Sequence, residues 1–194
     1  MDQFLTRIIE LSTWPGRIVG WLGLLLIVLV CMTVAMAQLG WNNLAQWQGD
    51  VLLLGNGITV NTLADLEWSV FAVMVLFGGV LAFREDGHVS VDFLSGHFSP
   101  RWQMIARVFG DLFLLLPFCA VVAWYGVRFA TVSFNSGEAS TYGGLTDRWI
   151  VKACIPLGFG LLGVAAVARA LRTVLRLAHG VRDDASGTIT ETGA

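Results

Sequence analysis

Apolar residues gather in four long runs along the chain, and charged residues are confined to the first turns and the ends of these runs. The runs cover residues 18–37, 63–83, 108–127 and 149–168. A hydrocarbon core about 30 Å thick is crossed by about 20 predominantly apolar helical residues, so each run is long enough to span it. The pattern predicts an all-α integral membrane protein with four transmembrane helices.

The composition agrees with a membrane protein that has no separate soluble domain. Hydrophobic residues make up 56% of the 194, charged residues 13%, and the mean hydropathy is +0.70. Soluble domains contain about 45–50% apolar and about 25% charged residues. We therefore expect a single membrane domain over residues 1–182. Residues 183–194, rich in Ser, Thr and Gly, have too little apolar surface to fold and are predicted to be a disordered tail.

The segment before the first run has the pattern of an amphipathic helix. Its apolar residues recur at helical spacing and its charged residues fall on other faces: Phe4, Leu5, Ile8, Ile9 and Leu11 against Asp2, Gln3, Arg7 and Glu10. Such a helix is typical of the membrane interface, where it lies in the plane of the bilayer. We expect it to end at Trp14-Pro15-Gly16.

Ala35-Met36-Ala37 at the end of the first run resembles a signal-peptidase site. The apolar run before it is longer than the 7–15 residues of a secretory signal. We therefore interpret residues 18–37 as a retained transmembrane helix.

The basic residues predict the orientation. With both termini in the cytoplasm, nine of the twelve lie inside and three outside, which is the distribution that the positive-inside rule favours. The nine are Arg7, Arg17, Arg84, Arg101, Arg107, Arg169, Arg172, Arg176 and Arg182, and the three are Arg128, Arg148 and Lys152.

Residues 38–62 then form a long outside loop that contains Trp41, Trp47 and the run Val51-Leu52-Leu53-Leu54. Loops of this length are usually functional or partly structured. We expect this one to lie on the membrane surface or against a partner, with Gly55-Asn56-Gly57 as a turn. A plain interfacial belt without a specific role is the alternative.

Five ionisable side chains fall within nine residues directly after the second run, in Arg84-Glu85-Asp86-Gly87-His88-Val89-Ser90-Val91-Asp92. On a helix, His88 and Asp92 would be i,i+4 neighbours able to pair. We predict a short interfacial helix between the second and third spans, with the next helix starting at Ser99-Pro100. This polar cluster would hold two spans at a fixed angle or meet a partner; the alternative is a solvated cytoplasmic loop.

Five short motifs follow one another from the second run to the fourth: Glu67-Trp68, Arg84-x-x-Gly87-His88-Val89-x-Val91-Asp92, Ser99-Pro100, Arg148-Trp149-Ile150-Val151-Lys152 and Ile155-Pro156-Leu157-Gly158. In this order they resemble the small membrane subunit of TRAP transporters, the DctQ-like proteins. The resemblance runs from about Arg17 to Leu171, and the His-Val-x-Val-Asp stretch is its most specific element. The N-terminal helix and the C-terminal tail lie outside it.

The resemblance implies a sodium-driven, ATP-independent uptake system for an organic acid in a bacterial inner membrane. In such a system a periplasmic binding protein captures the substrate and a large membrane subunit carries it across. The small subunit would bind the large one 1:1 and enlarge its static scaffold. The candidate structural or interface residues from these motifs are Glu67, Trp68, Arg84, His88, Asp92, Arg148 and Lys152.

Small side chains add two further candidates on the fourth run. Gly160, Gly163, Ala166 and Ala170 follow one another at spacings of 3, 3 and 4. Small residues let helices approach closely in lipid. The sequence leaves open whether this seam faces another helix of this chain or the large subunit.

We expect no catalytic centre, cofactor, metal ion or nucleic-acid partner. Cys31, Cys119 and Cys154 stand alone without a CxxC motif, and the three histidines, His88, His97 and His179, lie outside the apolar runs. A haem- or quinone-linked membrane anchor of an oxidoreductase is the alternative function, although it would lack axial histidines at membrane depth. A homo-oligomeric carrier or channel is disfavoured further, because few polar residues could line a pore.

Overall fold

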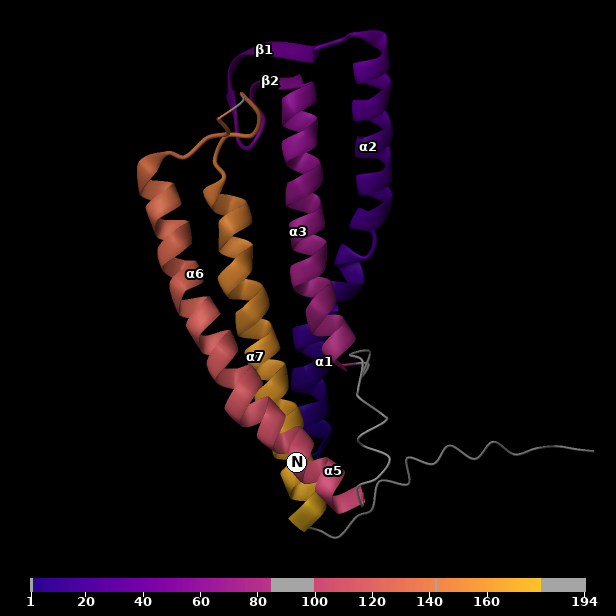
Figure 1. Ribbon diagram of the computed structural model, residues 1–194, viewed down its shortest axis with the longest axis vertical. Coiled ribbons are helices and arrows are strands. Elements are labelled where there is room, and N and C mark those ends of the chain that lie inside the picture. Colours follow the sequence, from indigo (N-terminus) through magenta and orange to yellow (C-terminus); the bar gives the residue numbers. More distant parts are fainter. Residues whose placement is uncertain (1, 85–99, 142, 179–194) are drawn as a thin grey trace, which may run out of the picture.

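The computed structural model describes residues 2–84, 100–141 and 143–178 as an elongated helical bundle with a small β-hairpin at one end (Figure 1). The elements in chain order are α1 (Asp2–Val19), α2 (Leu22–Leu39), β1 (Asn43–Val51), β2 (Gly55–Thr59), α3 (Val60–Arg84), α5 (Pro100–Phe109), the π-helix η1 (Gly110–Leu115), α6 (Leu116–Ser136) and α7 (Trp149–Ala178). We call the end with β1, β2 and residues 137–141 and 143–148 the hairpin end. The joint end is where α3 and η1 meet α7.

Within the described residues, four helical stretches are long and apolar enough to cross a membrane: Leu22–Leu39, Val60–Phe83, Trp102–Ser136 and Trp149–Leu175. The prediction of an all-α membrane protein with four spanning helices is confirmed. The exact limits of the spans, 18–37, 63–83, 108–127 and 149–168, stay a prediction. The predicted tail at residues 183–194 lies outside the described residues.

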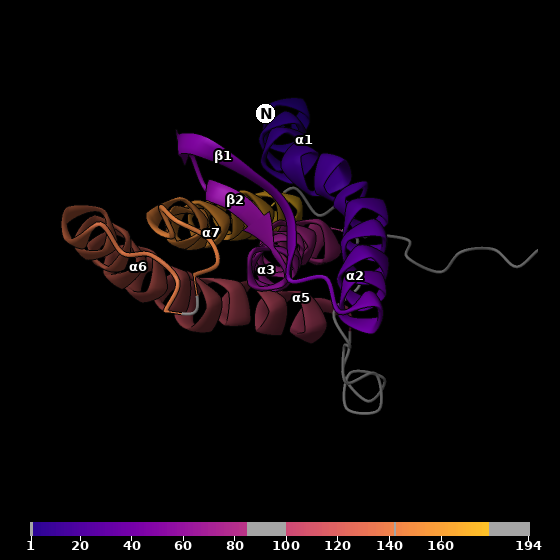
Figure 2. The ribbon, with the colours of Figure 1, turned by 90° about the horizontal axis from the view of Figure 1, so that it is seen from above.

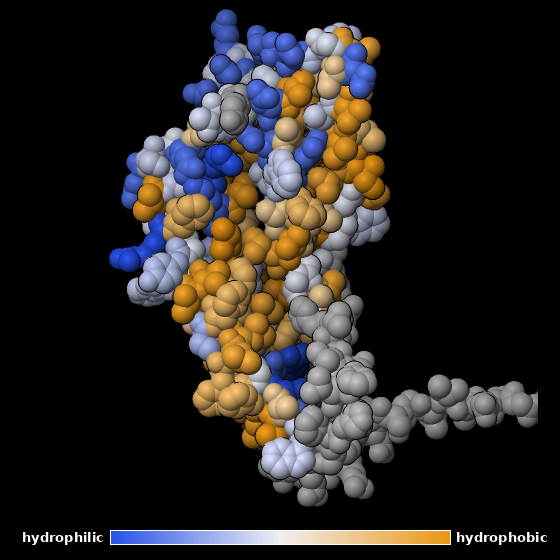
Figure 3. All heavy atoms as spheres, in the orientation of Figure 1, coloured by the Kyte–Doolittle hydropathy of each residue, from blue (hydrophilic) through white to orange (hydrophobic). Residues whose placement is uncertain are grey.

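The four long helices stand side by side in a row instead of closing around a common axis. Seen from above, α3 lies between α2 and α7, and α6 lies beyond α7 (Figure 2). Two clusters of buried side chains join neighbours in this row, one between α2 and α3 around Leu29 and Val70, the other between α3 and α7 around Phe83 and Ala166. A row buries less of each helix than a closed bundle does, and apolar side chains accordingly cover the middle of the outer surface (Figure 3).

Helix α1 is present, but the predicted end at Trp14-Pro15-Gly16 is wrong, because the helix continues through Pro15 to Val19. Its orientation also differs from the expectation that it lies in the interface plane. It runs lengthwise along α3 and α7 (Figure 1). Gly16 makes this approach possible, because a Cβ at this position would lie 2.7 Å from the carbonyl oxygen of Phe77. The fully buried Thr13 hydroxyl is satisfied within the helix by the carbonyls of Ile9 and Glu10. One face of α1 is therefore covered by helices of the same chain and not by lipid.

The long outside loop contains an antiparallel hairpin that the sequence analysis did not anticipate. Asn43 pairs with Thr59 and Val51 with Gly55, and the indole N–H of Trp47 donates to the Gly55 carbonyl at 2.9 Å. The predicted turn at Gly55-Asn56-Gly57 is wrong, because these residues form most of β2. The chain reverses three residues earlier, at 52–54, where Leu53 adopts a positive φ of 70°.

The third spanning helix is interrupted by η1 directly before Pro117. A proline has no N–H to donate, and its ring clashes with the carbonyl four residues earlier. The chain accommodates it with a wider turn, in which the Leu116 N–H bonds to the carbonyl of Asp111, five residues back. The break before Pro117 is thus a π-helix, and Asp111, its second residue, is buried.

Candidate functional site

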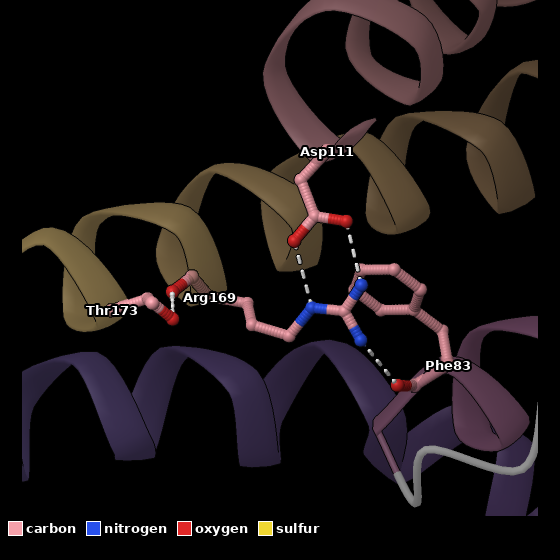
Figure 4. Close-up of polar contacts among 4 residues, drawn as sticks. All are labelled: Phe83, Asp111, Arg169 and Thr173. Carbon is pink, nitrogen blue, oxygen red and sulfur yellow. Dashed lines mark hydrogen bonds and ion pairs between the residues drawn. The ribbon is translucent and has the colours of Figure 1, made fainter. Parts of the chain in front are cut away.

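At the joint end, one arginine of α7 forms a two-pronged ion pair with the aspartate of η1. Arg169 donates from Nε to Asp111 Oδ2 at 2.8 Å and from Nη2 to Oδ1 at 2.6 Å (Figure 4). Asp111 is only 7% exposed. Paired, planar contacts of this kind are the strongest that arginine makes with a carboxylate. The pair fixes the start of the third spanning helix to α7.

The same guanidinium also holds the end of α3. Arg169 Nη1 donates to the carbonyl of Phe83 at 3.3 Å, and the guanidinium carbon lies 3.6 Å from the centre of the Phe83 ring. The last carbonyls of a helix lack partners within it and attract a cation. Since α3 ends at Arg84, Arg169 supplies that cation. The Arg169 side chain thus joins three parts of the chain: the C-terminal end of α3, the start of η1 and the second half of α7.

The sequence predicts a polar joint directly after α3, at residues 84–92. His88, Asp92 and the predicted interfacial helix lie outside the described residues, and of Arg84 the structure describes only its place at the end of α3. Their pairing stays a prediction. The joint that the structure contains uses Asp111 and Arg169, which the sequence analysis did not connect. An acid inside an apolar run requires a partner, and this signal could have led to Arg169, the first basic residue after Lys152.

At the hairpin end, Glu138 and Lys152 form a second ion pair between the α6–α7 loop and the first turn of α7. Ser133 donates its hydroxyl to Glu138 Oε2 at 2.9 Å, and the Lys152 ammonium lies 4.0 Å from the centre of the Phe129 ring. The hydrogen bonds from Lys152 and then from Ser133 lower the pKa of Glu138 below its usual value. Lys152, a predicted interface residue, is thus engaged within the chain.

The α6–α7 loop is fastened to α3 and to the hairpin by backbone contacts. The N–H of Leu145 donates to Asp65 Oδ2 at 3.3 Å, and the N–H of Thr146 donates to the carbonyl of Leu53 at 2.9 Å. The side chain of Leu145 is almost fully buried. Gly144 must be a glycine here, because a Cβ would lie 2.1 Å from Asp65 Oδ2. These contacts close the hairpin end into one unit, and Arg148, whose N–H bonds to the carbonyl of Glu138, belongs to it.

Glu67 and Trp68 point in different directions from α3. Thr33 of α2 donates its hydroxyl to Glu67 Oε1 at 2.5 Å, so this carboxylate is satisfied inside the row of helices. Trp68 is 73% exposed. Of this predicted pair, Trp68 is the residue available to lipid or to a partner, and a role of either in an interface stays a prediction.

The small-residue seam on α7 divides into two parts. A Cβ at Gly163 would lie 3.5 Å from the Cβ of Cys119, so this glycine faces α6 of the same chain. Ala166 is fully buried beside Phe83. A Cβ at Gly160 would meet nothing within 4 Å, and this glycine lines an open apolar groove of about 510 Å³ between α6 and α7. Most of the seam therefore serves packing within the chain.

Among the described residues, no group of three or more His, Cys, Asp or Glu side chains is placed to hold a metal ion. The three cysteines are free thiols.

Comparison with known protein families gives a match over most of the chain. The family described as "Tripartite ATP-independent periplasmic transporters, DctQ component" matches residues 26–176, about three quarters of the chain. No curated protein and no solved structure matched the chain.

Proposed function

Because the chain belongs to the DctQ family, and is therefore a small multi-pass component of a TRAP transporter in a bacterial inner membrane, we propose that it is the scaffold subunit of a sodium-driven uptake system for an organic acid. In this role it binds the large membrane subunit 1:1 and extends its stationary part. It carries neither the substrate nor the sodium ion itself.

The main support for this proposal is that the carboxylates on the apolar helices are already engaged. Asp65 accepts from the Leu145 backbone, Glu67 accepts from Thr33, and Asp111 is paired with Arg169. A transport path needs polar groups or broken helices near the midplane that can receive an ion and an anionic substrate. Groups that satisfy one another hold helices together but offer no such path.

The shape of the chain supports a partner in the membrane. A row of helices leaves broad apolar faces where α1 does not cover it, and lipid or another membrane protein must cover these faces. The family belongs to tripartite transporters, which have further components, and we assign one of these faces to the large subunit. The excess of basic residues at the joint end supports an orientation with both termini in the cytoplasm. The hairpin end would then lie in the periplasm, where the substrate-binding protein would approach.

Reconstitution in liposomes tests the proposal. The small subunit alone, the large subunit alone and the pair are compared for uptake of a radiolabelled organic acid, with the binding protein outside and a sodium gradient directed inward. The acid is first chosen by its stabilisation of the binding protein against heat. We expect uptake only with the pair. Uptake by the small subunit alone, or equal uptake by the large subunit alone, would contradict the scaffold role.

The family match favours this function over the oxidoreductase anchor. A haem absorbance band that copurifies with the complex would reverse that preference.

A further inference from the structure

A groove of about 850 Å³ runs along the outer side of α6 beside Ile155 of α7. It lies on a different side of α6 from the groove at Gly160, since the two share no lining residue. At its base Gly126 packs closely on α7, where a Cβ would lie 3.1 Å from Pro156 Cδ. Its volume is within the range of about 300–1,000 Å³ that is typical of ligand pockets.

The groove has a polar end and an apolar end. Val121, Tyr125, Arg128 and Val132 follow one another on one stripe of α6, because residues four, three and four apart share a helix face. Tyr125 and Val132 are 63% and 66% exposed, and Arg128 is exposed with them. Arg128 lies eight residues before Ser136, about 12 Å from the end of the helix. The cation therefore sits on an apolar surface, below the rim of the bundle.

A cation on an apolar, membrane-facing surface is unfavourable unless an anion accompanies it. Among the described residues, no acidic side chain pairs with Arg128. Glu138, the next acid along the chain, is held by Lys152 and Ser133. A counter-ion for Arg128 would then come from outside the described part of the chain.

We propose that this groove binds a phospholipid from the leaflet at the hairpin end, with its phosphate on Arg128. The order of groups along α6 matches the order of groups in a phospholipid. Among the polar groups Arg128 stands nearest the rim, at the level of a phosphate, and the Tyr125 hydroxyl follows one turn deeper at the level of the glycerol esters. Val121 lies deeper still, at the level of an acyl chain, and Ile155 borders the groove beside Gly126. Guanidinium groups bind phosphate with two parallel hydrogen bonds. A lipid would thus neutralise the cation and fill the groove at once.

The test uses the complex of this chain with its large subunit, purified in mild detergent and stripped of lipid. Native mass spectrometry records the binding of phosphatidylglycerol, phosphatidylcholine and diacylglycerol. The variants are Arg128→Gln, which removes the cation; Val121→Trp, which fills the apolar end; and Arg7→Gln, the removal of an exposed arginine on α1 as the matched control. Thermal unfolding without lipid confirms that each variant is folded.

Both phosphate-bearing lipids should bind the unsubstituted complex, and diacylglycerol should not. Arg128→Gln should weaken phospholipid binding about tenfold or more, as the loss of a charged hydrogen bond does. Val121→Trp should weaken it as well, and Arg7→Gln should leave it unchanged. Equal phospholipid binding by Arg128→Gln would overturn the proposal. So would release of the large subunit by Arg128→Gln with no change in bound lipid, since the partner of Arg128 would then be a protein carboxylate.

Discussion

Replacing Arg169 with alanine should destabilise the subunit more than any other single truncation at the joint end. The substitution leaves Asp111, 7% exposed, without a counter-charge. Breaking a buried ion pair by removing one partner costs about 3–5 kcal/mol. The Arg169 side chain is 29% exposed, so solvent screening favours the lower end, about 3 kcal/mol. Loss of the contact with the Phe83 ring adds about 1 kcal/mol.

Replacing Asp111 with alanine should cost less, about 2 kcal/mol, as for the loss of a charged hydrogen bond. Arg169 would keep the Phe83 carbonyl and ring and could turn its partly exposed head to water. Because the two side chains act as one unit, the double variant should be no less stable than Arg169→Ala alone. The coupling energy should be about 1–3 kcal/mol.

The assay is thermal unfolding of the purified complex in a single detergent, with all variants measured side by side. Arg172→Ala is the matched control, because Arg172 lies one turn further along α7 and its buried Nε has no hydrogen-bond partner among the described residues. We expect this control to change stability by less than about 1 kcal/mol. Single variants that each cost under about 0.5 kcal/mol, or effects that simply add in the double variant, would refute the reasoning.

Three further predictions concern α1, the hairpin end and the orientation. Gly16→Ala should destabilise the purified subunit by about 1–3 kcal/mol, because the added Cβ would collide with α3. The control Gly78→Ala, whose Cβ meets open space within a helix, should stabilise the subunit by up to about 1 kcal/mol. Equal effects of the two substitutions on stability would disprove the packing of α1 on α3. Because the folded-state pKa of Glu138 is lowered, its contribution to stability is present above the usual value of 4.5 and is lost as pH falls through the lower folded value. Melting curves recorded from pH 6 downward should therefore show an acid-induced loss that Glu138→Gln lacks, and identical curves would contradict it. A reporter active only in the periplasm should be silent when fused after Ala194 and active when inserted near Gly49; the reverse pattern would invert the orientation.

The spanning helices could be predicted from the sequence, because a continuous run of about 20 apolar residues identifies a membrane helix. The same local signals failed at the hairpin. Its strands carry Gly49, Gly55 and Gly57, which propensity assigns to turns, and the reversal falls on Leu53, whose positive φ no residue pattern indicates. Contacts with Thr146 in a distant loop hold that conformation. Tertiary structure, which a local pattern does not contain, therefore decides where this loop turns.

The joint was only half predictable for a similar reason. An acid at position 111 and an arginine at position 169 are visible as anomalies at the edges of apolar runs, and each alone calls for a partner. Their pairing depends on the burial of Asp111 in the π-helix before Pro117 and on α7 passing at that depth, 58 residues later. The sequence shows that a charged side chain lies in an apolar run and needs a partner. Which residue is that partner depends on the arrangement of the helices in space.

Polar contacts at both ends suit a scaffold built as a row of helices. In a closed bundle each helix is held by neighbours on several sides, but here α2 and α6 stand at the edges of the row (Figure 2). Apolar contacts in lipid have little directional preference and allow such helices to slide or tilt. Arg169 ties α3 and η1 to α7 at one end, and the contacts of Glu138 and Leu145 tie the α6–α7 loop to α7 and α3 at the other. Two fixed points on α3, on the stretch formed by η1 and α6, and on α7 define the tilts of these helices, which the proposed role as a stationary support for a moving partner would require.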